Sequence, residues 1–258
     1  MRRESTLREM GLGPVWRLRD APVDNIGVSP VPKRGFPAVT PTSAAVEQAP
    51  ARQHLTPTLA AGEGRGEAIA RMDWPELKST VADCDACMLC RERKQAVLGV
   101  GDVNADWLFI GEGPGAEEDE RGEPFVGQAG KLLDAMLAAI DLKRGDDVYI
   151  ANAVKCRPPD NRTPDPEETS ACWPFLERQV ALIKPKLIVA LGKPAAQTLL
   201  NAEVKISASR GRLFDFKGIP LIITYHPAYL LRNLADKAKA WEDLCFMRST
   251  MRKLKGTV

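Results

Sequence analysis

Four short apolar runs dominate the pattern of hydrophobic and polar positions in the second part of the chain. Their length and composition predict buried strands. The runs cover residues 107–110, 148–151, 187–191 and 221–224. The stretches between and after them predict helices over residues 129–140, 166–183, 194–200 and 235–254. Strands that alternate with helices predict an α/β fold, a three-layer α/β/α arrangement around a central four-stranded parallel sheet with right-handed crossovers.

The beginning of the chain carries no persistent apolar period and is rich in Pro, Ala, Gly, Thr and Ser. This composition predicts a disordered or weakly ordered Pro/Ala-rich N-terminal extension over residues 1–70, followed by one domain over residues 71–258. We expect order to begin near Asp73, a favourable N-cap, with Pro75 in the first helical turn. An apolar segment around Trp16 either docks an unknown protein partner or belongs to an inert extension.

The composition narrows the class of protein. The chain has 258 residues, 44% of them hydrophobic and 27% charged, and a formal net charge of +2. These values exclude a collagen-like chain, a wholly disordered chain and a highly basic packaging protein. No apolar run approaches the roughly 20 residues that span a bilayer, and the polar N-terminus lacks the apolar segment of a secretory signal. We therefore expect a cytoplasmic, monomeric protein with no membrane contact.

Positive charge is concentrated in the last part of the chain. From Lys205 onward there are 11 Lys and Arg residues against four Asp and Glu. An anionic partner, with nucleic acid first among the candidates, would explain this excess. The alternative is a solvated helix face, since several of these cations fall in the predicted C-terminal helix.

Polar and glycine-rich segments follow the predicted strands, at the edge where α/β folds place their active sites. The first strand leads into Gly111-Glu112-Gly113-Pro114-Gly115, and Glu118, Asp119 and Phe125 follow. The glycines allow a ligand to approach the backbone closely. The segment nevertheless matches neither a Walker loop nor a dinucleotide-binding fingerprint. Phe125 stands in a loop, where it either meets a ligand or merely covers the end of the sheet.

Asn152 and His226 follow the second and fourth predicted strands. The amide of Asn152 offers a donor and an acceptor side by side, which suits the edge of a base, although asparagine also caps loops. His226 precedes Pro227 and could be a general acid, a hydrogen-bond donor or a structural residue. The following Tyr229-Leu230-Leu231-Arg232 combines large apolar side chains with a cation, which suits wedging into a base stack beside a phosphate.

Six cysteines are present, and in a reducing compartment they predict metal ligands or buried apolar residues before disulfides. Cys84 and Cys87 form a Cys-x-x-Cys pair, and Cys156 and Cys172 form a second pair further along the chain. Four thiolates can hold either zinc or a 4Fe–4S cluster, and Cys90 at the same spacing leaves the choice of ligands open. A closed four-thiolate site favours a structural role.

Four separate motifs occur in one order along the chain. They are the paired cysteines, Gly111-Glu112-Gly113-Pro114-Gly115 with Pro124-Phe125-Val126-Gly127, Asn152-Ala153-Val154-Lys155-Cys156-Arg157-Pro158-Pro159, and His226-Pro227-Ala228-Tyr229-Leu230-Leu231-Arg232. With these motifs the chain resembles the family 4 uracil-DNA glycosylases, the iron–sulfur class of the uracil-DNA glycosylase superfamily. The resemblance covers nearly the whole region predicted to be ordered.

The resemblance implies a structural 4Fe–4S cluster on Cys84, Cys87, Cys156 and Cys172, with Cys90 at a non-ligand position. It also implies an enzyme that flips uracil out of single- or double-stranded DNA and hydrolyses its N-glycosidic bond in base excision repair. The loop after the second strand has no histidine, so ordinary turnover is expected rather than the covalent trapping of a related variant.

The resemblance also implies roles for individual residues. Asn152 would read the uracil edge, Phe125 would stack on the ring and His226 would reach O2. Backbone around Glu112 and Gly113 would line the pocket. Apart from the resemblance, thymine must be rejected sterically at its methyl group, and we assign this role to Glu112. Some superfamily members carry an aspartate that positions the water where this chain has Gly113. In this chain another acidic residue would therefore have to orient the water. The candidates are Glu112, Glu118 and Asp119.

Contacts to the DNA are expected mainly from the last part of the chain. Tyr229, Leu230 and Leu231 would fill the space that the flipped base leaves. The cations expected to contact phosphates are Lys193, Arg210, Arg212 and Arg232. Three other functions compete with the enzyme: a nucleic-acid-binding module without activity, an electron carrier built on the cluster, and a zinc protein. Intact Asn152 and His226 argue against the first two.

Overall fold

The computed structural model describes residues 63–256 of the chain. Residues 1–62, with the predicted docking segment, lie outside the described residues, so this part of the extension stays a prediction. The last part of the predicted extension instead forms helix α2, Glu63–Arg71, and Ile69 is 1% exposed in the core. Order therefore begins before Asp73, contrary to expectation, because a short helix with one buried side chain leaves no apolar period in the sequence.

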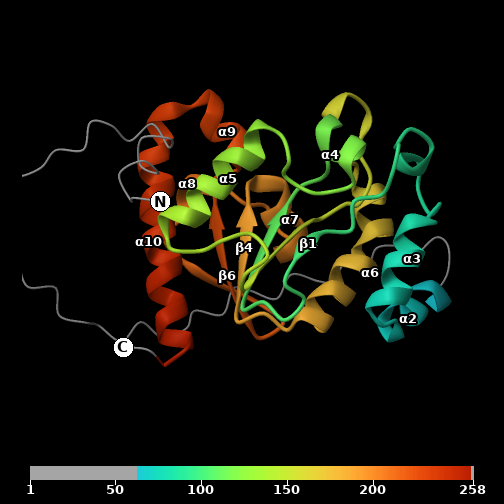
Figure 1. Cartoon of the computed structure of the whole chain (residues 1–258), viewed down its shortest axis with the longest axis horizontal. Helices are drawn as coiled ribbons and strands as arrows, with labels where there is room; N and C mark the ends of the chain where they lie inside the picture. The colour runs from blue at the N-terminus through green and yellow to red at the C-terminus, as the bar shows by residue number, and fades with distance from the viewer. Residues whose placement is uncertain (1–62, 257–258) are drawn as a thin grey trace, which may run out of the picture. The chain divides into compact units, whose positions relative to one another are not determined.

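A six-stranded sheet of order β1-β3-β2-β4-β6-β5 forms the centre of the domain (Figure 1). Its strands are β1 Val100–Gly101, β2 Trp107–Gly111, β3 Val148–Asn152, β4 Leu187–Leu191, β5 Leu213–Phe216 and β6 Ile219–Thr224. The four inner strands β3, β2, β4 and β6 are parallel, as predicted. The predicted number of strands is too small, since β1 and β5 add antiparallel edges. Both edges are short and only partly buried, so neither leaves a continuous apolar run.

Helices precede, connect and follow these strands, and the longer ones closely match the predicted ranges. They are α3 Trp74–Ala82, α4 Ala116–Arg121, α5 Gln128–Ala139, α6 Pro166–Ile183, α7 Lys193–Leu200, α8 Ile206–Ser209, α9 Pro227–Arg232 and α10 Lys237–Leu254, with short 3₁₀ turns η1 Met88–Arg91, η2 Pro159–Asn161 and η3 Leu234–Asp236. Asp73 is the N-cap of α3, as predicted, and its side chain accepts the backbone N–H of Glu76 at 3.0 Å. Within the described range, no helix is both long and apolar enough to cross a bilayer.

Successive residues of each inner strand face opposite sides of the sheet, and each side has its own apolar cluster. Phe109 of β2 belongs to one cluster with Leu133 of α5 and Met247 of α10. The preceding residue, Leu108, belongs to another cluster with Leu176 of α6 and residues of α7. The sheet is therefore covered on both faces, which confirms the predicted α/β/α layers (Figure 1).

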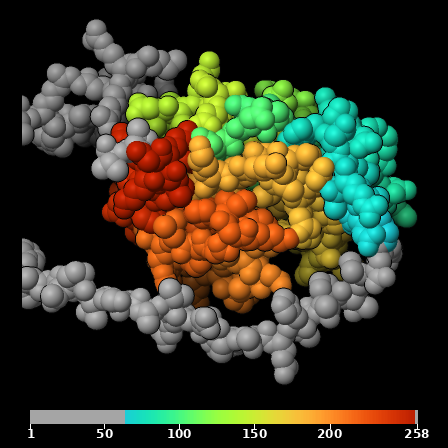
Figure 2. All heavy atoms as spheres, turned by 90° about the horizontal axis from the view of Figure 1, so that it is seen from below, coloured from blue at the N-terminus to red at the C-terminus, as the bar shows by residue number. Residues whose placement is uncertain are grey.

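A third apolar cluster attaches the N-terminal helices to the rest of the domain. Ile69 of α2 and Leu77 of α3 lie in it together with Cys156, Cys172 and Phe175. Figure 2 shows α2 and α3 (cyan) at one end of the described domain and α10 (red) at the other, with α6 (gold) between them. The predicted metal-ligating cysteines thus lie where the N-terminal helices join α6.

The four parallel strands end at one edge of the sheet. Gly111 of β2 pairs with Asn152 of β3, and Leu191 of β4 pairs with Thr224 of β6. The segments that follow these strands therefore emerge together, near α4, α5 and α9 at the top of Figure 1. His226 lies just beyond Thr224 and caps α9. Parallel pairing thus gathers residues that are far apart in the sequence.

Candidate functional site

Gly111, the last residue of β2, lies directly against two candidate side chains. A Cβ atom built on Gly111 would stand 2.4 Å from Asn152 Oδ1 and 2.6 Å from Phe125 Cζ. Both distances are well below van der Waals contact, so a larger residue would displace the amide or the ring. The structure thus brings Asn152 and Phe125 together over a position that requires glycine.

Asn152 carries a hydrogen-bonding oxygen without a partner. The residue ends β3 and is 2% exposed. Its Oδ1 is, within residues 63–256, the one buried side-chain polar atom that makes no hydrogen bond. An unpaired buried acceptor costs about 1–3 kcal/mol, so native structures rarely keep one without a reason. An N–H group of a bound ligand would satisfy this oxygen.

The environment of His226 selects one protonation state. Its Nδ1 accepts a hydrogen bond from the backbone N–H of Ala228 at 3.1 Å. Burial, with a smaller contribution from the charge of Arg232, lowers the pKa of His226 from 6.5 to about 4. Near neutral pH the ring is therefore uncharged, and its proton lies on Nε2, from which it can be donated to a ligand.

The rings of Phe125 and His226 lie next to each other. Their centroids are 5.4 Å apart, with an interplanar angle of 31°. Gly192 lies against the base of the His226 side chain, because its φ is +90° and a Cβ there would stand 2.9 Å from His226 Cβ. This conformation and this close approach both favour glycine. Sequence analysis missed Gly192, and a glycine directly after the third predicted strand is the signal that could have revealed it.

The loop that carries Phe125 is anchored by Glu118 of α4. Glu118 Oε1 accepts the backbone N–H groups of Val126 at 2.9 Å and of Gly127 at 3.1 Å. Its Oε2 accepts the backbone N–H of Gly115 at 3.1 Å. Both carboxylate oxygens are therefore engaged in holding backbone, which argues against the predicted role of Glu118 in orienting water.

Asp119 does not belong to the site. It is 2% exposed, and its carboxylate accepts the backbone N–H groups of Lys94 at 2.9 Å and of Gln95 at 3.4 Å. The prediction that Asp119 orients water is wrong, because its oxygens cap the loop after η1. Sequence alone could not separate this role from a catalytic one, since both use a carboxylate near the end of a strand.

Glu112 and Gly113 follow Gly111 at the strand end. Glu112 is partly exposed, and burial raises the pKa of its carboxyl group despite a hydrogen bond with Thr163. A Cβ on Gly113 would stand 2.8 Å from Val154 Cγ2, so an aspartate at this place would require Val154 to move. Of the three predicted acids, Glu112 is therefore the one whose carboxylate is not bound by backbone amides.

The predicted wedge contains both buried and exposed residues. Leu230 is 1% exposed and belongs to the core, so its prediction as a wedge is wrong. Tyr229 is held in place, because its hydroxyl donates to Asp236 at 2.6 Å. Leu231 is 41% exposed, and Leu234, which sequence analysis missed, is 65% exposed. Of the predicted triplet, Leu231 is thus exposed on this surface, and Leu234 lies exposed nearby in the sequence.

Arg210, predicted to contact phosphate, is a structural residue. Its guanidinium contacts Asp243 at 2.8 Å and Glu242 at 3.1 Å and lies over the ring of Tyr225. The side chain is only 13% exposed. The prediction is wrong because two carboxylates already pair with this cation and most of the side chain is covered.

The other three predicted cations are open to solvent. Lys193 begins α7 with a side chain that is 54% exposed, and Arg232 ends α9. Arg212 precedes β5, whose first residue Leu213 pairs with Ile222 near the carboxyl end of β6. All three therefore lie near the carboxyl ends of the parallel strands, where Asn152 and His226 also lie.

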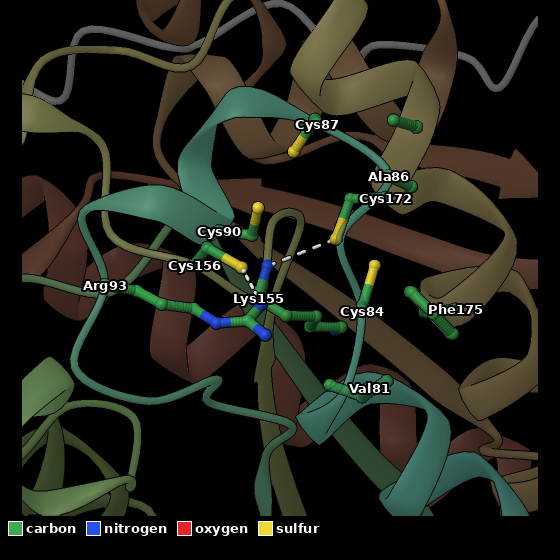
Figure 3. A pocket seen from close by; sticks show the side chains of 11 residues that line it. Val81, Cys84, Ala86, Cys87, Cys90, Arg93, Lys155, Cys156, Cys172 and Phe175 are labelled. Atoms are coloured by element: carbon green, nitrogen blue, oxygen red, sulfur yellow. Dashed lines mark hydrogen bonds between the residues drawn. The ribbon is translucent and has the colours of Figure 1, made fainter.

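A second candidate site consists of five thiols around one cavity (Figure 3). Cys84 and Cys87 follow α3, Cys156 follows β3, and Cys172 lies in α6. Cys90 of η1 lines the same cavity. The sulfur atoms point inward in Figure 3. The structure thus gathers the four predicted ligands from distant segments and adds Cys90 to the lining.

Arginine side chains lie against two of these sulfur atoms. Arg93 Nη1 donates to Cys156 Sγ at 2.8 Å, and Arg65 Nη2 donates to Cys84 Sγ at 3.5 Å. Burial raises the pKa of Cys156, while Arg93 acts in the opposite direction. Nearby cations favour the thiolate, which is the form that binds metals. Sequence analysis missed Arg65 because it lies in the segment predicted to be disordered.

The five thiols surround a space and do not converge on one point. In the described part of the chain, no three His, Cys, Asp or Glu side chains are close enough to hold one metal ion. A zinc ion about 2.3 Å from each of four sulfurs would draw them to within about 4 Å of one another. Binding of a single zinc ion would therefore require the sulfurs to move closer together.

Lys155 links the two sites. Its side chain is buried, and Nζ donates to the backbone carbonyl of Asn152 at 2.7 Å and to Gln179 Oε1 at 2.5 Å. Its backbone N–H donates to Cys172 Sγ at 3.2 Å. Because a buried ammonium group is costly without compensating negative charge, thiolates beside Lys155 would stabilise it.

Comparisons with known proteins point to one family. The family model for the uracil DNA glycosylase superfamily matches residues 98–245. The chain is similar to the type-4 uracil-DNA glycosylase of Pyrobaculum aerophilum, with 43% identity over 182 residues that cover 67% of this chain and 92% of the relative. It is also similar to the type-4 enzyme of Thermotoga maritima, with 45% identity over 177 residues and coverage of 67% and 92%. A type-5 uracil-DNA glycosylase of Pyrobaculum aerophilum shows 32% identity over 149 residues, 52% of this chain and 66% of the relative.

Proposed function

The chain belongs to the uracil-DNA glycosylase superfamily and to its type-4 enzymes, and we propose that Asn152, Phe125 and His226 bind the uracil that it removes. It is a uracil-DNA glycosylase of base excision repair, an enzyme that hydrolyses the N-glycosidic bond of uracil in DNA. The observation that carries the proposal is the unpaired Oδ1 of Asn152 beside the Phe125 ring.

Recognition of the base requires that uracil leaves the base stack, because the reacting bond cannot be reached inside it. Phe125 would stack on the extruded ring, an interaction worth about 1–3 kcal/mol. Asn152 would accept the N3–H of uracil at Oδ1 and donate from its amide nitrogen to O4. Cytosine has an unprotonated N3 and an amino group at this edge, so it would leave the Asn152 amide unpaired and would be rejected strongly.

Bond cleavage places negative charge on the departing uracil, partly on O2. His226 would donate a hydrogen bond from Nε2–H to O2 while its proton stays on the ring. An aligned donor of this kind stabilises the developing charge by about 3 kcal/mol in a site with little water. Because the ring is already uncharged near neutral pH, it needs no proton loss before it binds the base.

Hydrolysis also needs a water molecule that attacks the sugar. We assign the orientation of this water to Glu112, since Glu118 and Asp119 hold backbone amides. Glu112 lies directly after Gly111, whose backbone contacts the other two candidate side chains. We keep the exclusion of the thymine methyl group by Glu112 as part of this proposal.

An excision assay tests the assignment of the site. An end-labelled oligonucleotide with one uracil, single-stranded or paired, is incubated with the purified protein, and abasic sites are then cleaved with alkali. We expect cleavage at uracil in both forms and none in matched strands with cytosine or thymine at the same place. Binding without cleavage would contradict the assignment and favour a nucleic-acid-binding module without activity.

Charge reversal at Arg212 or Arg232 should weaken binding to DNA of any sequence and flatten the dependence of affinity on salt. Removing one cation from a phosphate reduces the slope of log affinity against log salt by about 0.9 on a duplex, because fewer counterions are released. Fluorescence anisotropy titrations at several salt concentrations measure this slope.

Lys217 provides the matched control for these charge reversals. It lies between β5 and β6, at the end of β6 remote from the site, and pairs with Glu177. Lys217→Glu should therefore leave the salt slope unchanged. An unchanged slope in both Arg212→Glu and Arg232→Glu would argue against phosphate contact by either residue.

We also propose that Cys84, Cys87, Cys156 and Cys172 hold a 4Fe–4S cluster. The thiol-lined cavity and the N–H donors on three of its sulfurs support this proposal. A bound cluster would supply a rigid covalent connection rather than a step of the reaction. It would join the end of α3, the segment after β3 and α6, the three segments from which the thiols come.

Replacing Lys155 with methionine should speed the loss of iron to a chelator by about tenfold or more, the usual effect of removing a group that supports metal ligands. The variant lacks the positive charge beside Cys172 and the donor to the Asn152 carbonyl, so the rate of uracil excision should fall as well. Iron and sulfide content and visible absorbance measure retention of the cluster.

Lys78→Met, at an exposed site on α3, is the control. Iron retention and excision at the control level would contradict the role of Lys155.

A further inference from the structure

Phe125 has an unusual backbone conformation for a residue with a side chain. Its φ is +54°, in the left-handed region, which costs a non-glycine residue about 1–3 kcal/mol. Such a conformation persists only where the surrounding structure enforces it. The direction of the Phe125 ring depends on this backbone, so the groups that enforce the conformation also determine where the ring lies.

Arg144, in the loop between α5 and β3, holds this backbone. Its Nη1 donates to the carbonyl oxygen of Pro124 and its Nη2 to that of Phe125, both at 2.8 Å. Its Nε donates to Asp134 of α5 at 3.0 Å, which orients the guanidinium. A planar group with donors in fixed directions can bind two consecutive carbonyls at once, which a lysine cannot do.

Two further contacts confine the same loop. The backbone of α5 approaches so closely that a Cβ on Gly130 would stand 1.7 Å from the carbonyl oxygen of Phe125. On the following residues, Glu118 accepts the backbone N–H groups of Val126 and Gly127. Arg144 thus holds the carbonyls of Pro124 and Phe125 while Glu118 holds the amides of the two residues that follow, and the ring of Phe125 lies beside that of His226.

We infer that Arg144 is the positioning residue for the stacking ring of Phe125. Its side chain is 20% exposed and pairs with Asp134, so it is engaged by the protein. It touches no reacting atom and acts through Phe125. The inference rests on the proposed function, in which Phe125 stacks on the extruded uracil.

Loss of Arg144 would leave two carbonyls without their donors and would let the backbone of Phe125 relax out of the left-handed region. A displacement of about 1 Å can cost about a hundredfold in the rate of a reaction that depends on positioning. We expect Arg144→Gln to lower the single-turnover rate of uracil excision at least about tenfold, with DNA affinity unchanged within about twofold.

A double-mutant cycle with Phe125→Ala separates positioning of the ring from a general effect on the fold. If Arg144 acts through the ring, Arg144→Gln should change the rate of the Phe125→Ala enzyme by less than about twofold. Arg248→Gln is the matched control, because the Arg248 side chain is 26% exposed and pairs with Asp141 at 3.5 Å, just after α5. This control should keep the wild-type rate.

The cycle distinguishes failure of the inference from failure of the proposed function. A Phe125→Ala enzyme with the wild-type rate would refute the stacking role itself. If Phe125→Ala is slow and Arg144→Gln slows it further by the same factor as in the wild type, the inference about Arg144 is overturned while the stacking role of Phe125 stands. If Arg144→Gln does not fold, Arg144→Lys takes its place in the same cycle. Lysine keeps the charge but loses the planar fork, so we expect at least about a threefold loss that disappears in the Phe125→Ala background.

Discussion

Replacing His226 with alanine should lower the single-turnover rate of uracil excision at least about a hundredfold, while DNA affinity is retained. The variant lacks the donor that stabilises charge on O2, which contributes about 3 kcal/mol, and about 1.4 kcal/mol of barrier changes a rate tenfold. The rate is measured with enzyme in excess over an end-labelled uracil oligonucleotide, and affinity by anisotropy. A variant with nearly wild-type turnover would remove His226 from the mechanism.

The pH dependence of folding gives an independent check on His226. Its pKa is about 4 in the folded protein and about 6.5 in the unfolded chain, so between these values the unfolded chain binds more protons. The contribution of His226 to stability is therefore complete above pH 6.5 and is lost as the pH falls towards 4, by about 3 kcal/mol.

His226→Ala lacks this titration. Its free energy of unfolding, measured with urea, should therefore fall less than that of the wild type between pH 6.5 and pH 4, by roughly the same 3 kcal/mol. An identical pH dependence in both proteins would show that the folded protein does not hold His226 as a neutral ring. This readout is independent of catalysis, so it tests the protonation state alone.

Asn152→Asp should lower uracil excision at least about a hundredfold, because base recognition depends on a neutral amide in a buried place. An ionised carboxylate would repel O4 of uracil, and it would lose the amide donor that O4 requires. We expect the residual activity to shift towards cytosine, whose amino group can donate to a carboxylate. Parallel assays on strands that differ only in uracil or cytosine measure both the loss and the shift.

Asn104→Asp is the matched control, because Asn104 is exposed in the turn before β2 and the substitution introduces the same charge. It should excise uracil at the wild-type rate. Retained uracil activity in Asn152→Asp would refute the reading role of Asn152, even if the His226 variant behaves as expected. Loss of uracil activity without any cytosine excision would still support the role in uracil recognition.

The strands show how far the fold could be predicted from the sequence. β2, β3 and β4 are buried along their whole length, so each leaves an unbroken apolar run that predicts a strand. β1 and β5 are partly exposed edges, and they become strands only because β3 and β6 offer them hydrogen-bonding partners. The apolar pattern within β1 or β5 does not indicate that a neighbouring strand will pair with it.

The site could be predicted in part for a related reason. Because the carboxyl ends of parallel strands share one edge, Asn152 and His226 could be placed together from the order of the elements alone. The same reasoning, a suitable residue type near the end of a strand, also selected Asp119, Leu230 and Arg210. The predictions for these three residues were wrong. Their roles depend on what each side chain meets: loop amides for the acid, the core for the leucine and two carboxylates for the arginine.

By itself, the sequence determined the longer helices, the inner strands, their parallel direction and the motifs that carry the family resemblance, because periodicity and spacing are properties of neighbouring residues. Only the tertiary structure decided which polar groups are paired. It left Asn152 Oδ1 without a partner, placed Arg144 on the carbonyls of Pro124 and Phe125, and brought Arg65 to Cys84. Pairing of this kind depends on distances between segments far apart in the chain, and packing of the elements sets those distances.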